Sequence, residues 1–266
     1  MPLGFSVDNL LPKSRGGGRL AIGLSKLTED DWLQPNPDLA ARAEGFAAYP
    51  EGIQLSPEGE APGAELAAML GLSGGLPEAA RNHHEDMCLL TLREGEEQYR
   101  LVGAAVAWPS DWTPAEKLGL PLRALHAPIQ GYEEQLATGV DHFMAKLKPG
   151  AIYGRANWFI AATGARRWVA KPPEVAFAHV TPENAGQTLF VRSERQTLRR
   201  LPETGAILFT IGIYIASLGE LSSPNVARLA GAMEDLLAGE GERRGAGAYA
   251  HALIGYAKRR ESERAQ

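Results

Sequence analysis

Residues 187–197 and 206–217 decide the fold, and they read QTLFVRSERQT and AILFTIGIYIAS. Both stretches are rich in the β-branched and aromatic residues that favour strands. Only residues 198–205 separate them, and so short a connection favours antiparallel pairing. We therefore expect these two strands to be neighbours in one sheet.

Three further stretches have strand character, at residues 87–92, 99–108 and 151–162. The first two flank Glu94-Gly95-Glu96, which is typical of a hairpin turn. Helices are expected at residues 37–46, 64–70, 76–84, 132–147, 225–239 and 247–260. The pattern predicts an α+β fold: an antiparallel five-stranded sheet with flanking helices, helical N- and C-terminal additions, and a pocket on its concave face.

The composition is that of one globular domain, with 266 residues of which 44% are hydrophobic and 22% charged. Residues 1–19 contain Arg15-Gly16-Gly17-Gly18-Arg19, and we expect them to form a flexible N-terminal extension. No repeat or low-complexity linker divides residues 20–262, which are predicted to form a single domain.

Several classes of partner and site are disfavoured by composition. A net charge of −5 argues against nucleic acid. Cys88 is the sole cysteine, which excludes an intrachain disulfide and a thiolate-held cluster. Residues 1–11 lack the pattern of a signal peptide, and the apolar run 205–218 is too short to span a membrane. We expect a cytoplasmic protein without a membrane or nucleic-acid partner.

Charged residues interrupt the predicted strands. Alternation along a strand places Arg192, Glu194 and Gln196 on one face and Arg195 on the other. A buried charge without a partner is strongly unfavourable. Arg155, in the strand at 151–162, is therefore expected to meet Glu194 and either Arg192 or Arg195. The alternative is an edge strand whose charged face is solvated.

Three blocks of sequence carry a resemblance to a known family. They are WPS at 108–110 with Glu116-Lys117 and LHAP at 125–128, then RANW at 155–158, and VRSERQTLRRLP at 191–202. Together they resemble the signature blocks of the heme-dependent oxidative N-demethylase family, in order from about residue 20 to 218. The family pattern often reads Ile-His-x-Pro-Val-Pro, where this chain has LHAPIQ at 125–130, so the substrate stays open.

The resemblance implies a PAS-like heme-binding domain and a heme b cofactor. It implies an oxygenase that oxidatively demethylates a small secondary amine, dimethylamine-like, and releases formaldehyde. Relatives work with separate reductases, so electrons are expected from NADPH through a separate flavin/iron–sulfur protein. The single cysteine and the absence of a Gly-x-Gly-x-x-Gly turn agree with an external electron source.

His126 is the expected axial ligand of the heme iron. Cys88 is the sole thiolate candidate, so an imidazole is the favoured donor. His126 precedes the stiff Pro128 in an irregular segment within a matched block. His179 and His142 remain alternatives, and a lone loop histidine is commonly structural. His83-His84, beside Glu85-Asp86, is interpreted as a solvated helix end.

Glu194 and Arg155 are the expected catalytic residues. Small secondary amines are cations at neutral pH, so an anionic Glu194 would bind and orient the substrate nitrogen. Arg155 would hold that carboxylate, contact heme-bound oxygen or clamp a heme propionate. The remaining expected cofactor contacts are Lys117, Arg192, Arg195 and Asn157.

Two other functions use the same predicted pocket. One is a heme-PAS gas or redox sensor without turnover, which would need an output domain or partner. The other is a module that binds a small ligand without heme. The sequence shows no separate output domain, which favours an enzyme. Homo-oligomerisation is possible in each case.

Overall fold

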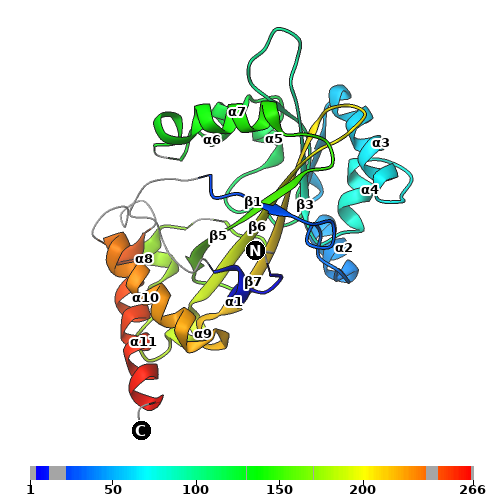
Figure 1. Ribbon diagram of the computed structural model, residues 1–266. Coiled ribbons are helices and arrows are strands. Elements are labelled where there is room, and N and C mark those ends of the chain that lie inside the picture. Colours follow the sequence, from blue (N-terminus) through cyan, green and yellow to red (C-terminus); the bar gives the residue numbers. More distant parts are fainter. Residues whose placement is uncertain (1–3, 12–21, 130, 170, 238–244, 265–266) are drawn as a thin grey trace.

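The computed structural model describes residues 4–11, 22–129, 131–169, 171–237 and 245–264. A single antiparallel sheet crosses the molecule, with strand order β1-β5-β6-β7-β3-β4-β2 (Figure 1). Its strands are β1 Ser25–Leu27, β2 Ile53–Leu55, β3 Asp86–Thr91, β4 Arg100–Ala105, β5 Ile152–Ala161, β6 Phe190–Arg200 and β7 Ile207–Ser217. The α+β class is confirmed.

The expectation of a five-stranded sheet was wrong, because the described sheet has seven strands. The five expected strands form its contiguous middle, and the additional β1 and β2 pair onto its two edges. Each edge strand is only three residues long, too short to show a strand-like alternation in sequence. The PAS-like character of the sheet stays a prediction.

Helices precede, separate and follow the strands. Their bounds are α1 Val7–Leu10, α2 Leu39–Ala48, α3 Glu60–Met69, α4 Leu76–Arg81, α5 Pro114–Lys117, α6 Leu122–His126, α7 Thr138–Lys146, α8 Pro173–Ala176, α9 Ala185–Thr188, α10 Ser223–Leu237 and α11 Ala250–Arg264. A π-helical turn, Glu133–Ala137, leads into α7, and short 3₁₀ turns cover Pro50–Gly52, Pro57–Gly59, Leu218–Glu220 and Ala246–Ala248. None of the described helices is long and apolar enough to cross a membrane.

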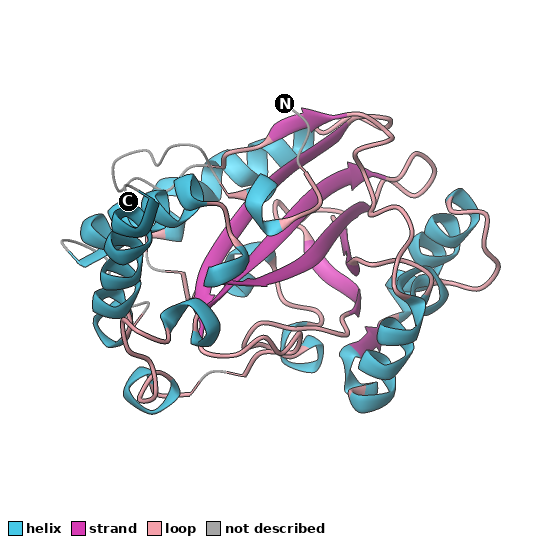
Figure 2. Ribbon diagram, turned by 90° about the horizontal axis from the view of Figure 1, so that it is seen from below, coloured by secondary structure: helices cyan, strands magenta, loops and turns pink. Residues whose placement is uncertain are grey.

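The helices cover both faces of the sheet. On the face that carries Glu194, Leu198 of β6 packs with Leu122 of α6 and Met144 of α7. On the opposite face, α10 and α11 pack over Val191 of β6. Figure 2 shows the twisted strands running between groups of helices, and Figure 1 shows α10 and α11 at the end remote from α3 and α4. A connected core thus fixes the strand that holds the charged residues.

The amino-terminal segment is packed where it is described. Val7, Leu10 and Leu11 are buried, and Asp8 accepts a hydrogen bond from the Ser222 hydroxyl at 3.0 Å, just before α10. Residues 4–11, which belong to the extension predicted to be flexible, thus pack against the rest of the domain. The Gly-rich stretch 15–19 lies outside the described residues.

Candidate functional site

Glu194 lies half-buried on β6 and is held at both carboxylate oxygens. Its Oε1 accepts a hydrogen bond of 2.6 Å from the Ser110 hydroxyl, and its Oε2 accepts one of 3.3 Å from Gln196 Nε2. Arg192 also contacts Ser110, so Arg192, Glu194 and Gln196 share a face, as the strand alternation predicts. The central position of β6 in the sheet excludes the alternative of a solvated edge strand.

Arg155 reaches Glu194 through an intermediate side chain. Its Nε donates to Gln196 Oε1 at 2.8 Å and its Nη1 donates to the carbonyl of Ile22 at 3.2 Å. Burial lowers the pKa of Arg155, and the charge of Glu194 acts in the opposite direction. The structure therefore brings the two expected catalytic residues together, with Gln196 between them.

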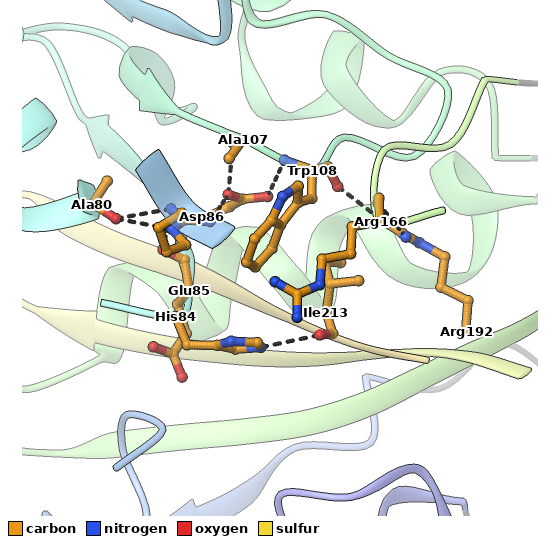
Figure 3. A network of polar contacts seen from close by, with 10 residues as sticks. Ala80, His84, Glu85, Asp86, Ala107, Trp108, Arg166, Arg192 and Ile213 are labelled. Carbon is orange, nitrogen blue, oxygen red and sulfur yellow. Dashed lines mark hydrogen bonds and ion pairs between the residues drawn. The ribbon is translucent and has the colours of Figure 1, made fainter. Parts of the chain in front are cut away.

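Arg192 is almost fully buried and ties β6 to two loops. Its Nε donates to the Ser110 hydroxyl at 3.0 Å, and its Nη2 donates to the Trp108 carbonyl at 2.8 Å. Its Nη1 donates to the carbonyl of Arg166 at 2.5 Å. All three nitrogens thus have protein acceptors, and Figure 3 shows the contact with Trp108. This side chain fixes the loop around Ser110 to the sheet.

A second buried network, centred on Asp86, holds the same loop at Ala107 and Trp108. Asp86 accepts hydrogen bonds from the backbone N–H of Ala107 at 2.8 Å and of Trp108 at 3.2 Å (Figure 3). Arg42 forms an ion pair of 2.8 Å with Asp86, and neither side chain is more than 1% exposed. The guanidinium of Arg42 also lies 4.6 Å from the Trp108 ring centroid. The turn before Ser110 is therefore fixed by charge-assisted bonds.

The interpretation of His83-His84 as a solvated helix end was wrong. Helix α4 ends at Arg81, and Glu85 and Asp86 are buried as the chain enters β3. His84 Nε2 lies 3.0 Å from the carbonyl of Ile213 (Figure 3). The sequence does carry a signal for burial: Glu85 and Asp86 stand directly before the apolar residues Met87, Cys88, Leu89 and Leu90. Carboxylates beside a buried run need protein partners, because little water reaches them.

His126 is the last residue of α6, and its ring faces the interior. Its Nδ1 lies 2.8 Å from the Leu122 carbonyl, which fixes the imidazole and leaves Nε2 for another partner. The ring stacks on Tyr132 with 4.4 Å between centroids and 8° between planes. Burial lowers the pKa of His126, the charges of Arg155 and Lys117 lower it further, and the bond to Leu122 opposes them. A neutral imidazole is the form that binds metals.

The other expected site residues divide into two groups. Lys117 lies near His126 and donates to the Leu125 carbonyl at 3.4 Å. Asn157 is exposed and sits opposite Glu194 in the β5–β6 pairing. Arg195 lies on the opposite face of the sheet, where its Nη1 donates to the Trp32 carbonyl at 2.7 Å. Arg195 is thus not brought together with the others. The alternative ligands His142 and His179 are both exposed.

The chemistry of the donor set around His126 is of the kind that holds a heme. It combines an imidazole nitrogen, Nε2, with no hydrogen-bond partner among the described residues, the cations Arg155 and Lys117, and the apolar surface of Leu125 and its neighbours. The Tyr132 hydroxyl is buried close by and has no hydrogen-bond partner among the described residues. His126 would hold the iron, and Arg155 and Lys117 could reach the propionates. The described side chains form no cluster of three His, Cys, Asp or Glu residues suited to a bare metal ion.

The fold is thus an α+β domain in which α6, ending at His126, packs on the sheet face that carries the oriented carboxylate of Glu194. The family model described as Haem-dependent oxidative N-demethylase, alpha subunit-like, matches residues 39–254. The chain belongs to this family, and the resemblance seen in its sequence blocks is confirmed. The family description indicates heme dependence, and its alpha-subunit-like term suggests an oxygenase with more than one subunit.

Proposed function

We propose that this protein is a heme-dependent oxygenase that demethylates a small secondary amine, dimethylamine-like, and releases formaldehyde. The observation that carries the proposal is the position of Glu194 relative to His126. Helix α6, which ends at His126, packs through Leu122 against Leu198 of β6, on the face of the sheet that also carries Glu194, and this supports one site for the expected iron ligand and the oriented carboxylate. The family membership gives this arrangement its chemistry.

Glu194 would bind the protonated amine. A carboxylate attracts a small ammonium ion strongly where water is largely excluded, and two hydrogen bonds hold this carboxylate in one orientation. The N-methyl group would thereby be placed in a fixed position relative to the side of the site that carries His126. Arg155 would maintain this geometry through Gln196.

The cofactor and the electrons come from outside this chain. When bound, heme b supplies the oxygen activation that the oxidation of the methyl group requires. The reaction consumes O2, protons and electrons, and yields formaldehyde, the shortened amine and water. We propose that NADPH supplies the electrons through a separate flavin/iron–sulfur reductase, because a chain with one cysteine lacks the ligands for an iron–sulfur centre.

A reconstituted assay tests the proposal. Heme-loaded protein is mixed with dimethylamine, O2 and NADPH, with and without a flavin/iron–sulfur reductase, and formaldehyde is measured. We expect formaldehyde only in the complete mixture. Rapid heme reduction by NADPH alone would refute the external reductase. Heme binding and reduction without amine-dependent formaldehyde would instead support the alternative, a heme-based gas or redox sensor without turnover.

A further inference from the structure

We propose that Ser110 is a positioning residue for Glu194 and that Arg192 sets the direction of its hydroxyl proton. The inference rests on the proposed role of Glu194 and extends it to the selection of cationic substrates. Ser110 comes from the loop after β4, and Glu194 comes from the middle of β6, so 84 residues separate them in sequence. No local sequence signal connects the two.

The direction of the hydroxyl proton follows from the chemistry of arginine. A guanidinium can only donate, so Ser110 Oγ must accept the 3.0 Å hydrogen bond from Arg192 Nε. The hydroxyl proton is then left for the second neighbour, Glu194 Oε1, at 2.6 Å. Ser110 therefore donates to the carboxylate in an arrangement that its surroundings impose.

The second oxygen of Glu194 is held by a similar pair of hydrogen bonds, which runs from Arg155 through Gln196. Arg155 Nε donates to Gln196 Oε1 at 2.8 Å, which turns the amide group of Gln196 toward Glu194 Oε2. The resulting bond is 3.3 Å long, so the 2.6 Å bond from Ser110 is the tighter constraint. A neutral side chain thus stands between each arginine and the carboxylate.

This arrangement has a consequence for the ligand. A direct ion pair with arginine would use the carboxylate oxygens and offset their charge. Here Ser110 and Gln196 orient Glu194, and neither Arg155 nor Arg192 forms a direct ion pair with it, although both arginines interact with its charge; the carboxylate oxygens therefore keep lone pairs that a bound cation can contact. The site should therefore take the protonated form of an amine and reject a neutral analogue of the same shape.

The loop that carries Ser110 is itself rigidly placed. Trp168 donates its backbone N–H to the Pro109 carbonyl at 3.0 Å, and Asp111 donates its own to the Trp168 carbonyl at 3.0 Å. Asp111 adopts a φ of 59°, a left-handed conformation that is unusual for a residue other than glycine. A rigid support of this kind is what a positioning hydroxyl needs.

A double-mutant cycle tests the inference. The heme-loaded wild type, Ser110→Ala, Glu194→Gln and the double variant are titrated calorimetrically with dimethylammonium. We expect Ser110→Ala to raise Kd on the order of tenfold, since hydrogen bonds to charged groups contribute more than neutral ones. In the Glu194→Gln background the same change should have little effect, because the carboxylate is already absent. Ser110→Thr, which keeps the hydroxyl, should restore binding.

Ser222→Ala is the matched control, because Ser222 also donates its hydroxyl to a carboxylate, Asp8, remote from the site. It should leave Kd unchanged. Should Ser110→Ala fail to fold, Ser110→Cys keeps the volume with a weaker donor and should still weaken binding. An equal effect of the Ser110 change in both backgrounds would show a merely structural role and overturn the inference.

An infrared measurement separates this inference from the proposed function. The carboxylate band of Glu194 is identified as the one lost in Glu194→Gln, without any amine present. It should shift in Ser110→Ala and stay in place in Ser222→Ala. An unmoved band overturns the positioning role even if the enzyme is active. A shifted band in a protein that never binds amines would support the positioning role and refute the proposed function.

Discussion

At the scale of single residues, the charge of Glu194 is the property that a substitution can isolate. Glu194→Gln keeps the volume of the side chain and removes its charge. We expect the variant to fold and bind heme but to lose amine-dependent formaldehyde formation on the order of a hundredfold, equivalent to roughly 2.7 kcal/mol. Glu174→Gln, at an exposed position of α8, is the control. Normal turnover by Glu194→Gln would make the carboxylate structural only.

His84 should make the protein sensitive to acid. Burial, the largest cause, acts together with the charges of Arg42 and Arg166 to lower the pKa of His84 from 6.5 to about 4, against the opposing effects of the bond to the Ile213 carbonyl and the charge of Asp86. Between these two values the unfolded chain binds more protons than the folded one, so stability falls as the pH drops through this window. Above the unfolded-state pKa of 6.5, His84 is neutral in both states and this loss of stability is absent.

The thermal midpoint at pH 7.5 and pH 5 checks this prediction. His84→Gln cannot take up a proton, so its midpoint should fall less between these pH values than that of the wild type. A matched change at the exposed His251 of α11 serves as control. The same loss of stability in His84→Gln and wild type would assign the acid sensitivity to other groups.

At the scale of elements, the pair of Arg42 and Asp86 joins α2, β3 and the loop of Trp108. Removing one partner of a buried ion pair leaves an uncompensated charge. Asp86→Ala should therefore lower the free energy of unfolding by about 3–5 kcal/mol, measured by urea denaturation. The exposed pair of Arg93 and Glu58 is the comparison, and Glu58→Ala should lower the free energy of unfolding far less, because solvent screens an exposed ion pair. Equal effects would contradict the structural role of Asp86.

The strands and the faces of β6 could be predicted from the sequence. The side chains that meet across distant parts of the chain could not. The middle of the sheet was found because its strands are long and apolar, and alternation assigned Arg192 and Glu194 to one face. Alternation could not show which face holds the site, so Arg195 was included although it lies on the other side. Ser110 was missed because its partners come from β6, far along the chain.

At the scale of the whole molecule, the described chain is built on one sheet with two unlike faces. One face packs against α10 and α11 through an apolar cluster that includes Val191. The other carries Glu194, Arg155 and Arg192, and α6, which ends at His126, packs on that side. The description of the family as haem-dependent and alpha subunit-like is consistent with the proposal that this chain holds a heme site and works with a partner. We propose that His126 is the residue that links the fold to the heme.

The visible absorption spectrum of the heme-loaded protein tests this link most directly. Wild type, His126→Ala, His142→Ala and His179→Ala are reconstituted with heme b, and the Soret band and heme content are measured. We expect that only His126→Ala loses heme or shifts its Soret band to a weakly ligated form. Replacement of the exposed His142 or His179 should have no effect. Full heme occupancy with an unaltered spectrum in His126→Ala would contradict the account.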